Sequence, residues 1–481
     1  MGAADWLRLC SERATTAMAT TDESKTTVVT PSPRAKSGGR KKSRFGRLRL
    51  QGSAMLNAKD LLHQTVVTKL YPAMVQFRLS PLRGSSPFKD AVPRDDSPTG
   101  GDKKDRDECV EPEKELHDET ELTPMLAAKW LTTEASVRFA EEVKCMAADV
   151  SSVFQITSEG CGGAYFLTAE SMSSSRPSNK KKMDPMGIFK PRDEEYMAPK
   201  NPRGYVKENS IVGVTEHPVN KGFRVGNGAL RERAAYLLDN AYGNFSGVPV
   251  TNLMVLKVNG EEKEGSMQRF VASQCSAEDM GTLKFAIPEV HKIGILDVRL
   301  FNTDRHAGNI LLSPRANDQT FGMTPIDHGF CLPSYKHLDG ATFDWLQWPQ
   351  AQFPFTCAEL DHIAALDEAR DAAVLRAVGI EEECVTTMRV CTAVLKLGAE
   401  AGFSLFEIGS LLQRDGDFSL PSELEKAVAK ATACVEQELN LSEEKNGAAF
   451  FDAVVAEVTS QAGSMFEGQP KKKVRSISCF S

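Results

Sequence analysis

One polar segment, and a carboxylate that follows it beyond a short hairpin pattern, constrain this chain more than any other feature. Residues 302–309 read Asn-Thr-Asp-Arg-His-Ala-Gly-Asn, which brings the acid Asp304, the imidazole His306 and the carboxamide Asn309 close together. Asp327 comes 18 positions after Asn309. Mg²⁺ prefers carboxylate and carboxamide oxygens, and an acid or imidazole can orient or deprotonate an attacking hydroxyl. These side chains therefore predict phosphoryl transfer from ATP, with Asn309 and Asp327 as metal ligands.

A glycine-rich hairpin and a lysine strand precede this segment. Residues 153–157 alternate in polarity and predict a strand, a glycine-rich turn follows, and residues 164–167 form the second strand of a hairpin. Small residues at such a tip let backbone N–H groups approach phosphate oxygens. Lys190, on a short strand at residues 187–190, supplies a point charge suited to phosphate. The predicted phosphate-binding residues of the hairpin are Gly160, Cys161, Gly162, Gly163 and Ala164.

A carboxylate is needed to hold the lysine in place. A helix is predicted over residues 228–239, because four apolar residues share one of its faces. Glu232 projects from this helix, and it is the candidate to pair with Lys190 and hold its ammonium at the phosphates. Glu194 and Glu195, which follow the lysine closely in sequence, are the competing partners.

Taken in order, these segments resemble the catalytic domain of the phosphatidylinositol 3-/4-kinase superfamily, and most of all its plant-type gamma class. Residues 304–311 (DRHAGNIL) and 326–329 (IDHG) are similar to the family's catalytic and activation segments, with Asp-Arg-His reversing the His-Arg-Asp of protein kinases. Residues 265–271 (GSMQRFV) resemble its hinge, and residues 187–195 (GIFKPRDEE) resemble its lysine strand. The resemblance covers about residues 160–354.

The resemblance implies an α+β, bilobal kinase-like fold with a small mixed lobe, a hinge and a mainly helical larger lobe. It implies ATP and Mg²⁺ as cofactors, with Asp327 at the ATP site. Asp304 then orients the substrate hydroxyl or takes its proton, and His306 is the rival base because its ordinary pKa of about 6.5 suits proton transfer. Arg305 either stabilises phosphate charge or holds the activation segment. Backbone contacts to adenine are expected from Gln268, Arg269, Phe270 and Val271.

Composition divides the chain into regions. Residues 1–122 are rich in Ser, Thr, Pro, Gly and charge and are predicted to be mostly disordered. Residues 123–150 are predicted to be a helical lead-in, residues 151–271 the smaller lobe and hinge, and residues 272–462 the larger lobe. A basic C-terminal tail follows at residues 463–481.

The larger lobe is predicted to be mainly helical. Residues 288–301 form an apolar helix pattern that leads into the catalytic segment. Ser422 and Glu425 form a capping box at the start of a later helix. An amphipathic stripe is expected to pack on this lobe, with a partner's groove as the alternative. The stripe consists of Phe450, Phe451, Val454, Val455 and Val458.

The cysteine pattern indicates a reducing compartment. The 11 cysteines include no Cys-x-x-Cys pair and no histidine at zinc spacing, so neither a disulfide framework nor a zinc site is expected. Cys161 is interpreted as a small packing residue, with a redox-sensitive thiol as the alternative. The sequence has no apolar run of about 18 residues, so no membrane span is predicted.

For the substrate, the resemblance implies the 4-hydroxyl of phosphatidylinositol. A protein Ser/Thr kinase is the second hypothesis, because gamma-class relatives as a group are associated with protein phosphorylation, and a non-catalytic scaffold is the third. Residues 34–49 and 471–475 together carry 12 basic side chains, which predicts a cytoplasmic protein that binds anionic membranes peripherally. The C-terminal patch is equally typical of nuclear import. No nucleic-acid partner is expected.

Overall fold

The computed structural model describes residues 131–149, 152–169, 185–315, 320–416, 418–438 and 447–466. The predicted disorder of residues 1–122 and both basic blocks lie outside these residues. Within them, the α+β fold predicted from the sequence is confirmed: an antiparallel sheet comes first in the chain, and helices make up most of the rest. None of the helices in these ranges combines the length and apolar character needed to cross a bilayer.

The N-terminal part is a five-stranded sheet with the order β1-β2-β3-β5-β4. Its strands are β1 (Ser152–Ile156), β2 (Tyr165–Ala169), β3 (Gly187–Pro191), β4 (Thr251–Val258) and β5 (Glu261–Arg269). β1 and β2 form the predicted hairpin, with Ile156 opposite Tyr165 next to its glycine-rich tip. β3 pairs with β2 on one side and with β5 on the other, where Lys190 lies opposite Ser266. The lysine therefore stands on a strand that is held from both sides.

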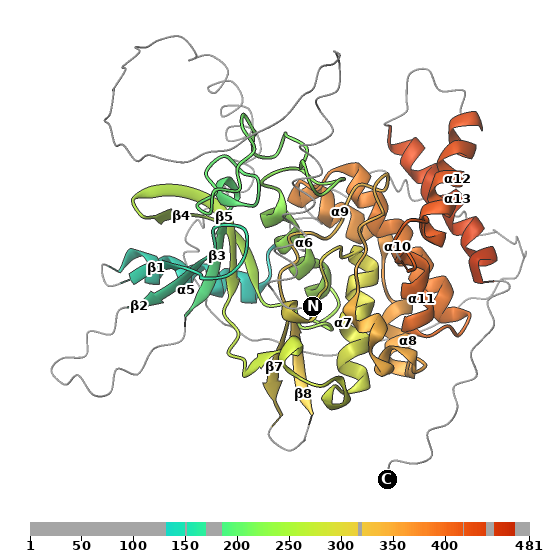
Figure 1. The fold of residues 1–481 in the computed structure, drawn as a ribbon, viewed down its shortest axis with the longest axis horizontal. Coiled ribbons are helices and arrows are strands. Elements are labelled where there is room, and N and C mark those ends of the chain that lie inside the picture. Colours follow the sequence, from blue (N-terminus) through green and yellow to red (C-terminus); the bar gives the residue numbers. More distant parts are fainter. Residues whose placement is uncertain are drawn as a thin grey trace, which may run out of the picture. The chain divides into compact units, whose positions relative to one another are not determined.

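Two helices accompany this sheet. α5 (Glu134–Ala148) begins where the Thr133 hydroxyl accepts from the Ser136 N–H, and it buries Phe139 and Val143 in the core of the sheet. α6 (Gly228–Asn240) matches the helix predicted over residues 228–239. In Figure 1, α6 lies between the sheet and the C-terminal helices. Glu232 on α6 is thereby brought near the sheet and the catalytic segments alike.

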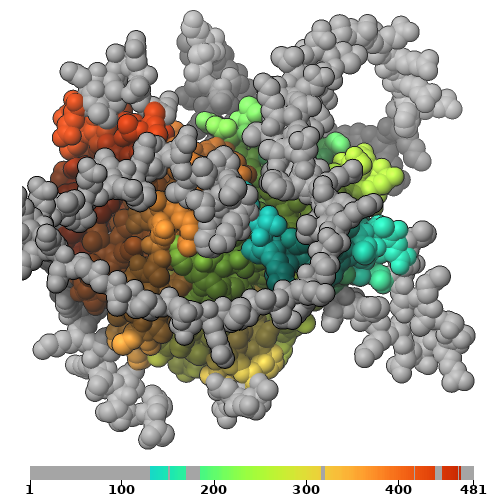
Figure 2. All heavy atoms as spheres, turned by 180° about the vertical axis from the view of Figure 1, so that it is seen from behind, coloured from blue at the N-terminus to red at the C-terminus, as the bar shows by residue number. Residues whose placement is uncertain are grey.

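The C-terminal part is mainly helical. It contains a small sheet of β6 (Cys275–Ser276), β7 (Ile310–Pro314) and β8 (Phe321–Pro325). Its helices are α7 (Ile287–Leu300), α8 (Cys357–Ala364), α9 (Glu368–Val378), α10 (Glu382–Glu400), α11 (Leu405–Leu412), α12 (Glu423–Glu438) and α13 (Ala448–Phe466). Apolar residues of most of these helices form one large core together with Trp345 and Trp348, whereas those of α9 pack with α6 in a second core. Seen from behind, the blue-green N-terminal part and the orange to red helices occupy opposite sides (Figure 2).

Two details of the helical part confirm the sequence predictions. The capping box is present, because the Glu425 N–H donates to Ser422 Oγ over 3.2 Å and the Ser422 N–H donates to Glu425 Oε2 over 2.8 Å. All five residues of the amphipathic stripe are buried in the same core as α10 and α12. The stripe therefore packs on its own lobe and is not an open groove surface.

Candidate active site

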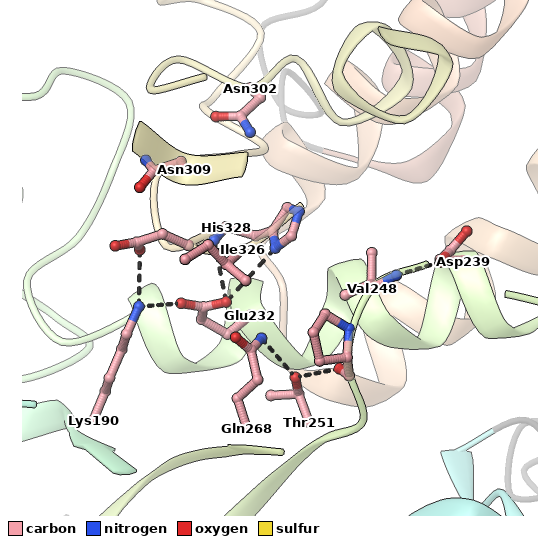
Figure 3. Close-up of polar contacts among 12 residues, drawn as sticks. Lys190, Glu232, Asp239, Val248, Thr251, Gln268, Asn302, Asn309, Ile326 and His328 are labelled. Atoms are coloured by element: carbon pink, nitrogen blue, oxygen red, sulfur yellow. Dashed lines mark hydrogen bonds and ion pairs between the residues drawn. The ribbon is translucent and has the colours of Figure 1, made fainter. Parts of the chain in front are cut away.

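Lys190, Glu232 and Asp327 meet in one charged cluster, although they come from three distant segments. Lys190 Nζ lies 2.6 Å from Glu232 Oε1 and 2.9 Å from Asp327 Oδ1. Figure 3 shows the lysine extending from its strand toward Glu232, with His328 on the other side of that carboxylate. The exposed side-chain fraction is 28% for Lys190 and 45% for Asp327, against 3% for Glu232. The cluster is therefore accessible to a ligand on the side of Lys190 and Asp327.

The charges of this cluster support one another. Burial by itself would lower the pKa of Lys190, but the carboxylates of Asp327 and Glu232 outweigh it and raise the pKa above its ordinary value. Burial by itself would raise the pKa of Glu232, but the Lys190 ammonium holds that pKa well below its usual range. Both side chains are therefore charged at neutral pH, and a full positive charge stands where phosphate binding is predicted.

Side-chain hydrogen bonds hold the backbone of the predicted catalytic segment. α7 ends at Leu300, and the capping residue Phe301 turns the chain with a φ of 44°, in the left-handed region. The Asp304 N–H donates to Asn302 Oδ1 over 2.9 Å, and Asn309 Nδ2 donates to Asp304 O over 3.0 Å. Because the amide nitrogen of Asn309 is bonded within the protein, its Oδ1 is left as the atom to meet a metal ion.

This donor set fits Mg²⁺. Asn309 contributes a carboxamide oxygen and Asp327 a partly exposed carboxylate, and Mg²⁺ in kinases takes few protein oxygens because phosphates and water complete its shell. Asp327 also has a φ of 57°, a left-handed backbone that is uncommon for a residue other than glycine. Strained backbone of this kind concentrates at functional sites. Asn309 and Asp327 remain our predicted metal ligands.

Asp304 has an unusual electrostatic environment. Burial and the negative charge of Asp327 raise the pKa of Asp304 to about 7, although Arg305 and Lys190 oppose this. A carboxylate with a pKa near neutrality is a better proton acceptor than an ordinary aspartate, whose pKa is about 4. The environment of Asp304 therefore suits a general base.

His306 uses its ring to cap the chain. Its Nδ1 accepts from the Gly308 N–H over 3.1 Å at the start of the short helix η4 (Ala307–Asn309). A neutral imidazole has one acceptor nitrogen, so this bond places the ring proton on Nε2. Burial also lowers the pKa of His306. A ring whose acceptor nitrogen is already bonded is a poor base, and the geometry therefore favours Asp304 over its rival.

Arg305 does not point to an exposed cleft, which corrects the alternative that it stabilises phosphate charge. Its side chain is fully buried, with Nε 3.0 Å from Asp297 Oδ2 on α7. Its Nη1 donates to Asn309 O over 2.6 Å and to Ile326 O over 2.9 Å. These carbonyls belong to the segments that carry Asn309 and Asp327. Arg305 therefore joins the two predicted metal-binding segments from within the core. This agrees with the other role considered for it, that of holding the activation segment.

His328 connects this buried arginine to the charged cluster, a role that the sequence did not suggest. Arg305 Nη2 lies 3.0 Å from His328 Nε2. A guanidinium can only donate, so Nε2 accepts and the ring proton lies on Nδ1, which is 3.7 Å from Glu232 Oε2. The backbone N–H of His328 also donates to Glu232 Oε2, over 3.1 Å (Figure 3). Glu232 is therefore held from both sides, by Lys190 and by His328.

The structure excludes both competing partners of the lysine. Glu194 Oε1 pairs with Lys263 over 2.9 Å and its Oε2 accepts from Tyr165 over 2.7 Å. The carboxylate of Glu195 accepts from the first two N–H groups of α6, at 3.0 and 2.9 Å, and thereby caps that helix. Glu232 alone of the three candidates contacts Lys190 among the described residues.

The glycine hairpin and the hinge each need one correction. The Gly163 N–H donates to Glu194 O over 2.9 Å, so this amide is not free for phosphate as predicted. At the hinge, the Arg269 N–H donates to Val250 O over 2.8 Å and the Phe270 N–H to Met186 O over 3.0 Å. These two amides cannot donate to adenine, because the sheet already uses them. The Val271 N–H and the carbonyl groups of the hinge are left to contact adenine.

Several residues that shape the site were not predicted. Asp297 accepts from Arg305, from Asn302 Nδ2 over 3.0 Å and from Trp345 Nε1 over 3.1 Å, and it is fully buried. Asp344 Oδ2 accepts from the N–H of Ala307 over 2.7 Å. An aspartate inside the apolar helix pattern of residues 288–301 was the available signal for Asp297. Asp344 had no such local signal, because its partner is distant in sequence.

Comparison with known proteins agrees with this geometry. Residues 176–408 match the family model for phosphatidylinositol 3- and 4-kinases. The chain is 42% identical over 288 residues to a rice protein named phosphatidylinositol 4-kinase gamma 4. The aligned region covers 57% of this chain and 48% of the relative. It is 40% identical over 298 residues to the Arabidopsis thaliana protein of the same name, over 58% of this chain and 49% of the relative.

A third relative, phosphatidylinositol 4-kinase gamma 3 of Arabidopsis thaliana, is 39% identical over 306 residues, or 59% of this chain and 50% of the relative. The chain thus matches about half the length of these curated relatives. The matched residues 176–408 contain β3, α6 and the catalytic segments, and hence the whole charged cluster around Lys190. Residues 176–408 of this chain are therefore a kinase domain of the phosphatidylinositol 3- and 4-kinase family.

Proposed function

We propose that this chain transfers the γ-phosphoryl group of ATP to a hydroxyl acceptor with the help of Mg²⁺. The observation that supports this most is the cluster of Lys190, Glu232 and Asp327, in which Lys190 and Asp327 lie 137 positions apart in sequence. The family to which the kinase domain belongs implies ATP and a divalent metal. Positioning and charge stabilisation carry most of the catalysis in phosphoryl transfer, and the cluster provides both.

The residues divide the work by their chemistry. The Lys190 ammonium binds the α- and β-phosphates, and Glu232 and His328 keep it in place. Asn309 and Asp327 hold the metal, which neutralises charge on the phosphates when bound. Asp304 orients the acceptor hydroxyl and takes its proton. His306 Nε2–H is left as a donor to a phosphate oxygen.

We propose the 4-hydroxyl of phosphatidylinositol as the acceptor. The support is the similarity to relatives that are named phosphatidylinositol 4-kinases, together with the family match over residues 176–408, which include the whole cluster. These relatives are about twice as long as the matched region, so the lipid acceptor is a proposal for this chain rather than a consequence of its family.

A protein Ser/Thr acceptor is the second candidate, and one structural observation favours it. Between Asp327 and Phe343, Lys336 is the only Lys or Arg. Its Nζ lies 2.5 Å from Glu383 Oε1, so its charge is already paired within the protein. An inositol lipid headgroup is anionic, and a segment facing it would be expected to offer unpaired positive charge. The segment between Asp327 and Phe343 offers no unpaired Lys or Arg charge.

One assay separates the candidates. Purified full-length chain is incubated with labelled ATP and Mg²⁺, and it is offered phosphatidylinositol vesicles and a mixture of protein substrates side by side, with an Asp327→Ala variant as the blank. Label on the 4-position of the lipid, absent with the variant, supports the lipid acceptor. Label on protein alone supports the second candidate. No transfer to either, with no ATP hydrolysis, would overturn the enzymatic proposal and favour the scaffold hypothesis.

We also propose that the basic blocks bring the enzyme to anionic membranes. Residues 34–49 and 471–475 carry 12 Lys or Arg side chains, and each contributes roughly 1 kcal/mol near an anionic leaflet. The chain should co-sediment with phosphatidylserine-containing vesicles and not with neutral ones, and binding should weaken above about 0.15 M salt. Replacing the 12 residues with Gln should abolish this binding and leave ATP turnover on a water-soluble acceptor intact. Unchanged binding would contradict the proposal and direct attention to nuclear import.

A further inference from the structure

Two polar side chains that the proposed reaction does not use reach the glycine hairpin. Asn201 and Arg203 lie in the segment between β3 and α6, residues 192–227. Asn201 is buried and Arg203 is partly buried. Neither side chain is needed to form a regular helix or strand, yet both contact the tip between β1 and β2.

The guanidinium of Arg203 converges on a single turn. Its hydrogen bonds reach four backbone carbonyls of the hairpin: Thr157 O at 2.7 Å, Glu159 O at 2.8 Å, Gly162 O at 3.0 Å and Ser158 O at 3.4 Å. A guanidinium presents its donors in a rigid planar fork, so a turn bound by several of them at once has little freedom to change shape.

Asn201 joins the same hairpin to the lysine strand. Its Nδ2 donates to Cys161 O over 2.8 Å and to Glu194 O over 3.1 Å. The Gly163 N–H donates to that same Glu194 carbonyl. Glu194 ends the short helix η1 (Arg192–Glu194) that follows the strand of Lys190, so these bonds set the position of the hairpin tip relative to the lysine.

The direction of these carbonyls decides where the hairpin amides point. A trans peptide places its C=O and N–H on opposite sides. Because the carbonyls of Thr157, Ser158 and Glu159 turn toward Arg203, the N–H groups of residues 158–160 point away from the guanidinium. Gly160 has a φ of 89°, a left-handed backbone. Successive amides around such a residue form a concave site for an anion.

We propose that Asn201 and Arg203 are positioning residues for phosphoryl transfer. By holding the carbonyls of the hairpin on one side, they present its amides to the terminal phosphates of ATP at a set position relative to Lys190. This inference rests on the ATP-dependent activity proposed above. The two side chains act through the hairpin and do not themselves touch the nucleotide.

The test compares a ligand that has phosphates with one that has none. Binding of ATP with Mg²⁺ and of adenosine is measured by calorimetry for the full chain and for Arg203→Met. The variant should bind ATP about tenfold or more weakly and adenosine within about twofold of the unaltered chain, because only ATP reaches the hairpin amides. Arg203→Lys, which restores a charge and part of the donor set, should fall between the two. Hydrogen exchange of residues 157–163 should rise in Arg203→Met.

The controls separate positioning from general stability and from the proposed function. Lys207→Met removes a positive charge from the same segment, and among the described residues its ammonium forms no hydrogen bond with the hairpin, so both ligands should bind unchanged. Equal weakening of ATP and adenosine by Arg203→Met would show a merely structural role and overturn the inference, as would unchanged ATP binding. Unaltered chain that binds ATP but transfers no phosphoryl group would refute the proposed function alone, since the binding comparison does not depend on turnover.

Discussion

Two ion pairs of the kinase domain have similar chemistry and opposite surroundings. Lys190 and Glu232 meet at the edge of the cluster, where 28% of the lysine side chain is exposed. Arg305 and Asp297 meet beneath the catalytic segment, where both side chains are 0% exposed. The first pair has an open side on which a phosphate can replace solvent. The second is enclosed, and the remaining donors of Arg305 are bonded to two backbone carbonyls and to His328 Nε2.

The contrast shows how neighbouring positions in one motif divide between chemistry and architecture. Asp304 and His306 flank Arg305 in sequence, yet Arg305 turns into the core while Asp304 keeps an electrostatic environment suited to proton transfer. His328 connects the two pairs, with Arg305 on one side and Glu232 on the other. The exposed pair is therefore expected to control activity, and the enclosed pair to control folding.

Breaking the enclosed pair should have the largest effect. Arg305→Met leaves Asp297 buried without its counter-charge, and removal of one partner of a buried pair costs about 3–5 kcal/mol. The free energy of unfolding, measured by urea denaturation, should fall by that amount, and activity should be lost with it. The double variant Arg305→Met with Asp297→Asn should recover part of the loss, because no unpaired charge remains. A loss no greater than that of Lys190→Met would contradict the distinction between the pairs.

Removing the predicted metal ligand on the exposed side should abolish turnover with little effect on folding. Asp327→Ala should lower kcat by about 1,000-fold or more, which corresponds to about 4 kcal/mol of transition-state stabilisation. Asp327→Asn should behave alike, and it is the better control for stability because Asn tolerates the left-handed backbone at this position. Weak ATP binding should persist in both. Full activity with Mg²⁺ present would refute the metal assignment.

Breaking the exposed pair from the lysine side should have the next largest effect. Lys190→Met removes the charge that binds the phosphates, and kcat/KM for ATP should fall by about 100-fold. The unfolding midpoint should change less than in Arg305→Met, because water can enter beside Glu232. A loss of less than about tenfold would mean that another lysine binds the phosphates.

The pH dependence of kcat/KM distinguishes Asp304 from His306 as the base, and it is the smallest of the expected effects. Asp304 must be ionised to act as base, and its raised pKa predicts that kcat/KM falls as the pH drops through about 7. If His306 is the base instead, its lowered pKa predicts that kcat/KM falls only at pH values below about 6.5, the ordinary pKa of histidine. His306→Ala should leave the limb near pH 7 in place, whereas Asp304→Asn should remove it with most of the rate. Disappearance of the limb in His306→Ala would reverse the assignment.

Added Mg²⁺ gives an internal check on that assignment. The negative charge of Asp327 contributes to the raised pKa of Asp304, so a cation bound at Asp327 should lower it. The acidic limb should therefore move to lower pH as the Mg²⁺ concentration rises. A limb that does not respond to Mg²⁺ would belong to a group remote from Asp327.

The sequence by itself determined the kind of chemistry and the order of the elements. The spacing of Asp304, Asn309 and Asp327, together with a lysine on a short strand, predicted phosphoryl transfer, and the resemblance of these segments to a kinase superfamily implied a bilobal α+β fold. These features depend on residue type and local periodicity, which can be read along the chain. The helix that carries Glu232 was predicted for the same reason, because four of its apolar residues repeat at helical spacing.

Only the tertiary structure decided which of these polar residues face a ligand. Arg305 and Lys190 are both cations in polar motifs, and burial beside Asp297 assigns one to the core while the other stays partly exposed beside Glu232. The bond from Gly308 to His306 and the convergence of Arg203 on the hairpin were likewise invisible in the sequence. Each depends on where a chain segment is placed in space, and periodicity or composition carries no record of a single side chain's partner.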